Sequence, residues 1–115
     1  MSREDFRFHF TLRVRWSECD AQGIAFNGSY MEYIEVAQAE YFRNLGMEIY
    51  DQSRRAYFDT AMVKATLEFN APVRVDELLD IHTRVLTIGR TSIIMETEIY
   101  RHESDDVCTR AELVH

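Results

Sequence analysis

Hydrophobic and polar residues alternate strictly near the start of the chain. The apolar positions are Phe6, Phe8, Phe10, Leu12, Val14 and Trp16, and the residues between them are polar or basic. A period of two over this length is typical of a β-strand with one buried face. The pattern therefore predicts a strand over residues 6–16, with its basic face turned away from the core.

A pattern with the spacing of a helix begins near Ser29. Ser29 and Glu32 have the spacing of a capping box, in which each side chain accepts a backbone N–H at the helix start. Gly46 follows as the predicted C′ residue, which takes a positive φ. The apolar face of this helix comprises Tyr30, Met31, Tyr33, Ile34, Ala37, Tyr41, Phe42 and Leu45. So wide an apolar face predicts deep packing against a curved surface.

Strand patterns resume after the poorly determined segment 47–59. The predicted strands lie at residues 61–69, 78–88, 91–102 and 107–114. Pro72 ends the first of them or places it where a ladder N–H is dispensable. Gly89-Arg90 has the spacing of a hairpin turn between the next two. The order predicts an α+β fold, in which one antiparallel sheet curls around one long helix. Because a single sheet covers only part of such a helix, we expect a second protomer.

Composition and charge narrow the class of protein. A length of 115 residues predicts a single domain over residues 1–115. The formal net charge of −7 argues against nucleic acid as a partner, because phosphate binding needs a basic surface. No apolar run reaches the length of a membrane span, and the first residues lack a signal-peptide core. The two cysteines do not make a disulfide framework, so we expect a cytoplasmic protein. Because no residues have metal-ligand spacing, we expect no metal. The charge and the lack of a long apolar run also lead us to expect neither a nucleic-acid nor a membrane partner.

Asp20 stands between the first predicted strand and the helix. A helix N-terminus offers free N–H groups that polarise a carbonyl or hold an oxyanion. A carboxylate beside it can attack an acyl carbon or activate water for that attack. The structural alternative is an Asx-turn, a common role of Asp shortly before a glycine such as Gly23. Both interpretations stay open on these residues alone.

Three further residues have a chemical and a structural interpretation. Asn27 is either a polar contact to substrate or an N-cap residue. Glu35 either reaches the rim of a pocket or is a solvated helix carboxylate. Cys19 is either a nucleophile or, as its alternating position favours, a small buried side chain.

The segment ECDAQGIAFNGSYMEYIEVAQAEYF, from Glu18 to Phe42, resembles the opening motif of the 4-hydroxybenzoyl-CoA thioesterase family of hotdog-fold acyl-CoA thioesterases. In that family an acidic residue, one intervening residue, Asp, two residues and Gly precede an aromatic-bearing helix. Downstream, LEFNAPVRVDELLDI resembles the family's strand–Pro–turn–Asp–strand segment, and GRTS resembles its next hairpin. The resemblance runs from about Arg13 to Leu113. It implies a hotdog fold, an antiparallel sheet of about five strands wrapped around one long central helix, in homodimers that often pair into homotetramers with active sites between protomers.

The resemblance also implies hydrolysis of an acyl-CoA thioester without a cofactor, since coenzyme A is part of the substrate. Asp20 corresponds to the catalytic aspartate, acting as nucleophile or general base. The backbone N–H groups of Phe26 and Asn27 correspond to those that polarise the thioester carbonyl. The candidate substrate contacts are Tyr30, Glu35 and Arg90.

Two alternative functions stay open. One is hydrolysis of acyl groups on a carrier protein, which the acidic surface disfavours because carrier proteins are acidic too. The other is a non-catalytic acyl-CoA-binding module on the same fold. In the subgroup associated with the Tol–Pal envelope system, which this chain resembles, a histidine commonly stands at the position of Asn27, whereas other hotdog thioesterases place asparagine there. Family members also usually continue beyond the position of His115, so we expect a truncated chain or a short edge strand at its end.

Overall fold

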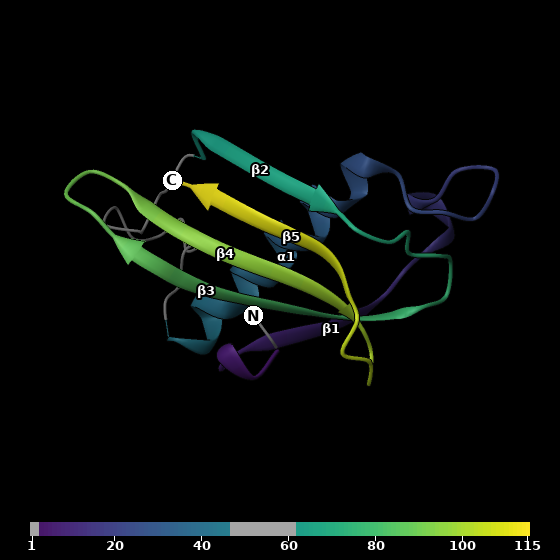
Figure 1. Cartoon of the computed structure of the whole chain (residues 1–115), viewed down its shortest axis with the longest axis horizontal. Helices are drawn as coiled ribbons and strands as arrows, with labels where there is room; N and C mark the ends of the chain where they lie inside the picture. The colour runs from purple at the N-terminus through teal and green to yellow at the C-terminus, as the bar shows by residue number, and fades with distance from the viewer. Residues whose placement is uncertain (1–2, 47–61) are drawn as a thin grey trace.

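One antiparallel sheet of five strands lies against one long helix (Figure 1). The computed structural model describes residues 3–46 and 62–115. In chain order the elements are η1 (Arg3–Asp5), β1 (His9–Arg13), η2 (Trp16–Glu18), α1 (Asn27–Asn44), β2 (Lys64–Phe69), β3 (Leu78–Ile88), β4 (Ile93–Arg101) and β5 (Val107–Val114). The strands are ordered β1-β3-β4-β5-β2, each antiparallel to its neighbours. The predicted α+β hotdog architecture is confirmed.

The first strand is shorter than the alternation of residues predicts. β1 ends at Arg13, and Trp16 lies in η2 with 70% of its surface exposed. The Glu18 N–H donates to the Arg15 carbonyl at 3.0 Å, which closes a 3-10 turn and ends the extended run. The Glu18 carboxylate caps this turn by accepting the Arg15 N–H at 2.8 Å. At the other end Phe6 precedes the strand and packs its ring against His82, with centroids 5.6 Å apart.

The helix begins two residues earlier than predicted, at Asn27, with Phe26 as its N-cap residue. The predicted capping box is therefore wrong. Ser29 lies inside the first turn, and its hydroxyl donates to the carbonyl oxygen of Glu18 at 2.9 Å. Glu32 is exposed. The predicted end is confirmed, because Gly46 has a φ of +82° just beyond the last helical residue.

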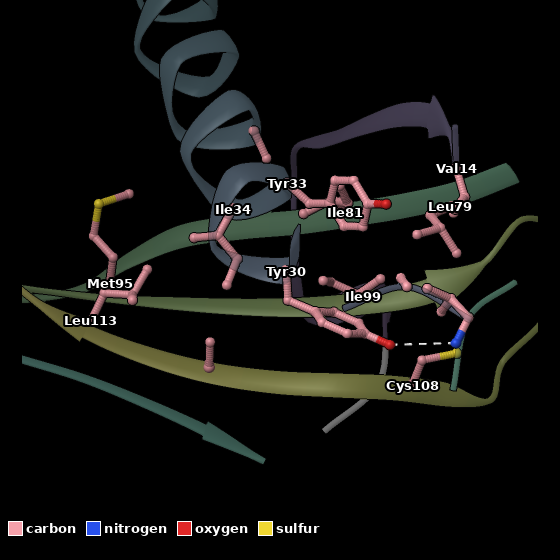
Figure 2. Packing of buried hydrophobic residues seen from close by; sticks show 14 of the residues in the cluster. Val14, Tyr30, Tyr33, Ile34, Leu79, Ile81, Met95, Ile99, Cys108 and Leu113 are labelled. Atoms are coloured by element: carbon pink, nitrogen blue, oxygen red, sulfur yellow. Dashed lines mark hydrogen bonds between the residues drawn. The ribbon is translucent and has the colours of Figure 1, made fainter. Parts of the chain in front are cut away.

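The hydrophobic core lies between α1 and the sheet (Figure 2). Its fully buried members include Tyr33, Ile34, Ala37, Leu79, Ile81, Met95, Ile99 and Leu113. Leu45, which the helical pattern places on the buried face, is instead 55% exposed at the C-terminal end of α1. Thr83 and Thr97 also face the core, where their hydroxyl oxygens lie 3.0 Å apart and satisfy each other.

The hairpin between β3 and β4 is confirmed, with a four-residue connection in place of the two residues expected. Gly89 N–H donates to the Ser92 carbonyl at 2.8 Å. The last strand, β5, is an interior strand between β4 and β2, so the expectation of a short edge strand at the end of the chain is wrong.

Strand β2 forms an edge of the sheet that α1 leaves largely uncovered. Ala65 and Phe69 point to the core side but are exposed, and Val63 just before the strand is 75% exposed. Within the part of the chain that the structure describes, no strand pairs with the outer side of β2. An apolar open edge of this kind is a ready template for pairing with another strand.

The sheet face turned away from α1 is polar. In one row across all five strands, His9, His82, Glu98, Arg110 and Glu68 lie opposite one another. Glu98 is fully buried and accepts the Arg110 Nε–H at 2.9 Å. Charged groups therefore occupy this face where a second hydrophobic layer would otherwise pack.

Candidate active site

Asp20 lies in a tight loop between η2 and α1. Its Oδ1 atom accepts the backbone N–H groups of Gln22 at 2.8 Å and Ile24 at 3.2 Å. Gly23 has a φ of +75°, a conformation that L residues with side chains rarely adopt. The predicted Asx-turn is therefore present. Among the described residues, the second carboxylate oxygen, Oδ2, has no hydrogen-bond partner, so the turn uses only half of the carboxylate.

Backbone hydrogen bonds join this loop to the segment just before β3. Ala25 N–H donates to the Val73 carbonyl at 2.9 Å, and Val75 N–H donates to the Gly23 carbonyl at 2.9 Å. Ile24 and Arg74 form an isolated antiparallel bridge. The loop that carries Asp20 is thereby held in one conformation by backbone hydrogen bonds.

The first turn of α1 offers two backbone donors. Phe26 N–H donates to the Glu18 carbonyl at 2.9 Å and is therefore engaged within the chain. The N–H groups of Asn27 and Gly28 belong to the first helical turn, which has no intrahelical acceptor for them. Within the described residues neither group has another acceptor. These two donors, with the positive end of the helix dipole, favour a negatively polarised oxygen.

An open cavity of about 610 Å³ adjoins this helix start. Its lining residues are Arg15, Ser17, Glu18, Phe26, Gly28, Ser29 and Glu32. Phe26 is 51% exposed, so an aromatic surface lines part of the opening. Asp20 does not line the cavity itself. The cavity is large enough to admit a small organic group.

Glu18 is a site residue that sequence reasoning used only as part of a motif. Its side chain is 5% exposed and accepts hydrogen bonds from Arg15 and from the Tyr33 hydroxyl, the latter at 3.0 Å. Burial alone would raise the pKa of the Glu18 carboxyl, but these hydrogen bonds together outweigh it and lower that pKa. Burial, followed by the neighbouring Glu18, raises the pKa of the Tyr33 hydroxyl. Glu18 is therefore held as a buried carboxylate.

The other predicted site residues do not all gather here. Tyr30 is 2% exposed, and its hydroxyl accepts the Val73 N–H at 3.3 Å, so within one chain it belongs to the core (Figure 2). Glu35 is exposed on α1. Arg90 lies in the β3–β4 turn, at the opposite end of the molecule from the segment between η2 and α1 (Figure 1).

The remaining candidate groups provide little chemistry. Burial raises the pKa of the Cys19 thiol, which disfavours the reactive thiolate. Among residues 3–46 and 62–115, no group of three or more His, Cys, Asp or Glu side chains is arranged to hold a metal ion. In the same ranges no helix combines the length and apolar character needed to cross a membrane.

The long helix against a five-stranded antiparallel sheet defines a hotdog-fold protein, with a candidate site where the Asp20 loop enters α1. The sequence profile of the Thioesterase superfamily matches residues 22–108. Because this range covers more than half of the chain, the chain belongs to the Thioesterase superfamily. The predicted family and the predicted class, a thioester hydrolase, are confirmed. The matched range begins two residues after Asp20, so it does not test that residue.

Individual proteins show the same likeness. Acyl-CoA thioester hydrolase YbgC of Escherichia coli O6:H1 is 28% identical over 99 residues, which cover 84% of this chain and 72% of the relative. The 1,4-dihydroxy-2-naphthoyl-CoA thioesterase Slr0204 from Synechocystis superposes with a TM-score of 0.84 at 18% identity, over 94% of this chain and 79% of its own. A 4-hydroxybenzoyl CoA thioesterase variant in complex with 4-hydroxybenzoyl CoA gives a TM-score of 0.85 at 20% identity, over 93% and 80% of the two chains. At these identities the two solved structures establish the likeness of fold.

Proposed function

We propose that this protein hydrolyses an acyl-CoA thioester to the free acid and coenzyme A, with Asp20 as the catalytic carboxylate. The observation that carries the proposal is the hydrogen bonding of the two oxygens of that carboxylate. Oδ1 is fixed by the backbone N–H groups of the loop, while Oδ2 is left without a partner among the described residues. A structural Asx-turn needs only Oδ1. The second oxygen is available for chemistry and is held by a rigid loop.

The reaction begins when the thioester carbonyl oxygen binds at the start of α1. The N–H groups of Asn27 and Gly28 are the free donors there, whereas Phe26 N–H is engaged by Glu18 and contributes by fixing the turn. Asp20 then either attacks the carbonyl carbon or removes a proton from an attacking water molecule. Negative charge develops on the carbonyl oxygen, where the helix donors stabilise it. The C–S bond breaks, the thiolate leaves and takes up a proton, and water supplies the oxygen of the acid.

The active unit in this proposal is a homodimer formed across β2. The exposed apolar residues of this edge, among them Val63 and Phe69, would be covered by the partner. Antiparallel pairing across the edge sets one end of each sheet beside the opposite end of the other. The β3–β4 turn of one protomer would thus approach the Asp20 loop of its partner. Arg90 is then a candidate contact to coenzyme A phosphates from the second subunit.

The proposal is tested by measuring thiol release from a panel of aromatic and aliphatic acyl-CoAs. We expect Asp20→Asn to lower kcat by about 10²–10⁴-fold, the range typical of a lost acid–base group. The amide keeps an oxygen at the Oδ1 position, so the loop and the fold should survive. Asp105→Asn, at an exposed position, is the matched control and should retain wild-type activity.

Three outcomes would contradict the proposal. Equal rates for wild type and Asp20→Asn would leave Asp20 as a turn residue only. Tight binding of acyl-CoA with no turnover by the wild type would support a non-catalytic binding module. Turnover of acyl-carrier-protein substrates but not of acyl-CoA would move the substrate class to acyl groups on carriers.

A further inference from the structure

Glu18 joins three parts of the molecule through its side chain. Its Oε1 atom accepts the Arg15 backbone N–H at 2.8 Å, which caps η2. The same oxygen accepts the Tyr33 hydroxyl of α1 at 3.0 Å. Its Oε2 atom accepts the Arg15 Nε–H at 2.7 Å and also pairs with the guanidinium Nη2. One oxygen therefore links η2 to α1, and the other oxygen binds only the Arg15 side chain.

The backbone of Glu18 makes the same connection a second time. Its carbonyl oxygen accepts the Ser29 hydroxyl at 2.9 Å and the Phe26 N–H at 2.9 Å. Glu18 thus contacts α1 from both its side chain and its main chain. It stands two residues before Asp20, at the entrance of the loop that carries the proposed catalytic carboxylate.

We propose that Glu18 is a positioning residue, which sets the place of the Asp20 carboxylate relative to the free N–H groups of Asn27 and Gly28. This inference rests on the proposed function. Glu18 acts through the hydrogen bonds that its Oε1 atom accepts, and it does not touch the substrate carbonyl. Hydrolysis needs the Asp20 carboxylate and the two N–H donors to act on the same thioester carbonyl group. A shift of about 1 Å between the carboxylate and the donors therefore lowers the rate by as much as about 10²-fold.

The substitution Glu18→Gln separates position from charge. A glutamine keeps one oxygen, which at the Oε1 place retains the bonds to Arg15 N–H and Tyr33. Its amide nitrogen at the Oε2 place loses the ion pair with the Arg15 guanidinium and removes the negative charge. If Glu18 instead acted by its charge on the protonation of Asp20, this variant would shift the acid limb of the pH–rate profile.

The substitution Tyr33→Phe removes only the link from Oε1 to α1. A matched control exists on the outer sheet face, where the Tyr100 hydroxyl donates to the buried Glu98 at 2.7 Å. Tyr100→Phe removes the same kind of buried tyrosine–glutamate bond at a place away from the Asp20 loop. The two phenylalanine variants therefore share any general effect of losing such a bond on stability.

The experiment measures kcat, KM, the pH–rate profile and the free energy of unfolding for wild type, Asp20→Asn, Glu18→Gln, Glu18→Ala, Tyr33→Phe and Tyr100→Phe. Positioning predicts that Glu18→Ala and Tyr33→Phe lower kcat by about 10–100-fold with KM changed less than about threefold. Glu18→Gln should retain kcat within about threefold and leave the pH–rate profile unshifted. Tyr100→Phe should lose stability as Tyr33→Phe does but retain kcat.

Each of the following results would overturn the inference that Glu18 is a positioning residue. Equal losses of kcat in Tyr33→Phe and Tyr100→Phe would indicate a general effect of stability. A Glu18→Gln variant as slow as Glu18→Ala, or one with a shifted acid limb, would indicate a role of the charge. Full kcat in Tyr33→Phe, while Asp20→Asn is inactive, would remove the positioning role and leave the proposed function intact. No turnover by wild type, or an Asp20→Asn variant as fast as wild type, would overturn both. If Glu18→Ala does not fold, the comparison of the two phenylalanine variants decides.

Discussion

The side chain of His82 is buried, and neither ring nitrogen has a hydrogen-bond partner within the described residues. Burial, followed by the positive charges of His9 and Arg3, lowers its pKa from 6.5 to about 4. The unfolded chain therefore binds a proton near pH 6.5, whereas the folded protein binds it only near pH 4. Stability from this residue is complete above pH 6.5 and is lost as the pH falls toward 4.

We expect His82→Phe to flatten the pH dependence of the unfolding free energy between pH 6.5 and 4, where the wild type loses roughly 3 kcal/mol from this group. Phenylalanine preserves the ring contacts with Phe6 and Tyr100. The measurement is urea unfolding at a series of pH values. Both proteins should still lose stability below pH 4, because the pKa of Asp80, lowered to about 2, places its own loss there. An unchanged slope between pH 6.5 and 4 in His82→Phe would show that another group titrates.

At the scale of single elements, two substitutions at the start of α1 distinguish the predicted capping box of Ser29 and Glu32 from the observed hydrogen bond of Ser29 to Glu18. Ser29→Ala removes the hydroxyl that donates to the Glu18 carbonyl, and we expect a loss of about 1 kcal/mol in unfolding free energy. Glu32→Ala at an exposed position should change it by less than about 0.5 kcal/mol. Chemical denaturation of the two variants provides the comparison. Similar losses from both would support a capping box in solution.

The same helix shows what sequence patterns reveal and where they stop. Its apolar periodicity and Gly46 predict its presence and its end correctly, because these signals are local. The role of Ser29 depends on Glu18, eleven residues away, and the bond from Tyr33 to Glu18 spans fifteen. No local pattern marks such contacts. Asp20 is a candidate from the sequence because its place before a helix is visible there, whereas the contacts of Glu18 are seen only in the fold.

The sheet order shows the same limit. The hairpin of β3 and β4 follows from a short turn between two apolar runs, and it is observed. The pairing of β2 with β5, and of β1 with β3, joins segments far apart in the chain. Alternation alone does not choose among such partners, so the interior place of β5 is seen only in the fold.

At the scale of the whole molecule, the open edge of β2 predicts how the protein assembles. Val63 is 75% exposed in one chain, so a charge there costs little in a monomer. In a dimer formed across β2 the same charge would be buried against the partner's edge without compensation, and such burial is costly. We therefore expect Val63→Asp to shift the protein toward a monomer.

Light scattering coupled to size-exclusion chromatography measures this shift directly. Val36→Asp is the matched control, because Val36 is also exposed, at 41%, but on α1 and away from the β2 edge. We expect the control to remain a dimer. Thiol release should fall together with the dimer in Val63→Asp if the proposed dimer is the active unit, because in that dimer Arg90 of the β3–β4 turn is the proposed contact from the second subunit. A monomeric Val63→Asp variant with full activity would place the whole catalytic site within one chain, and a Val63→Asp variant that remains dimeric would place the interface elsewhere.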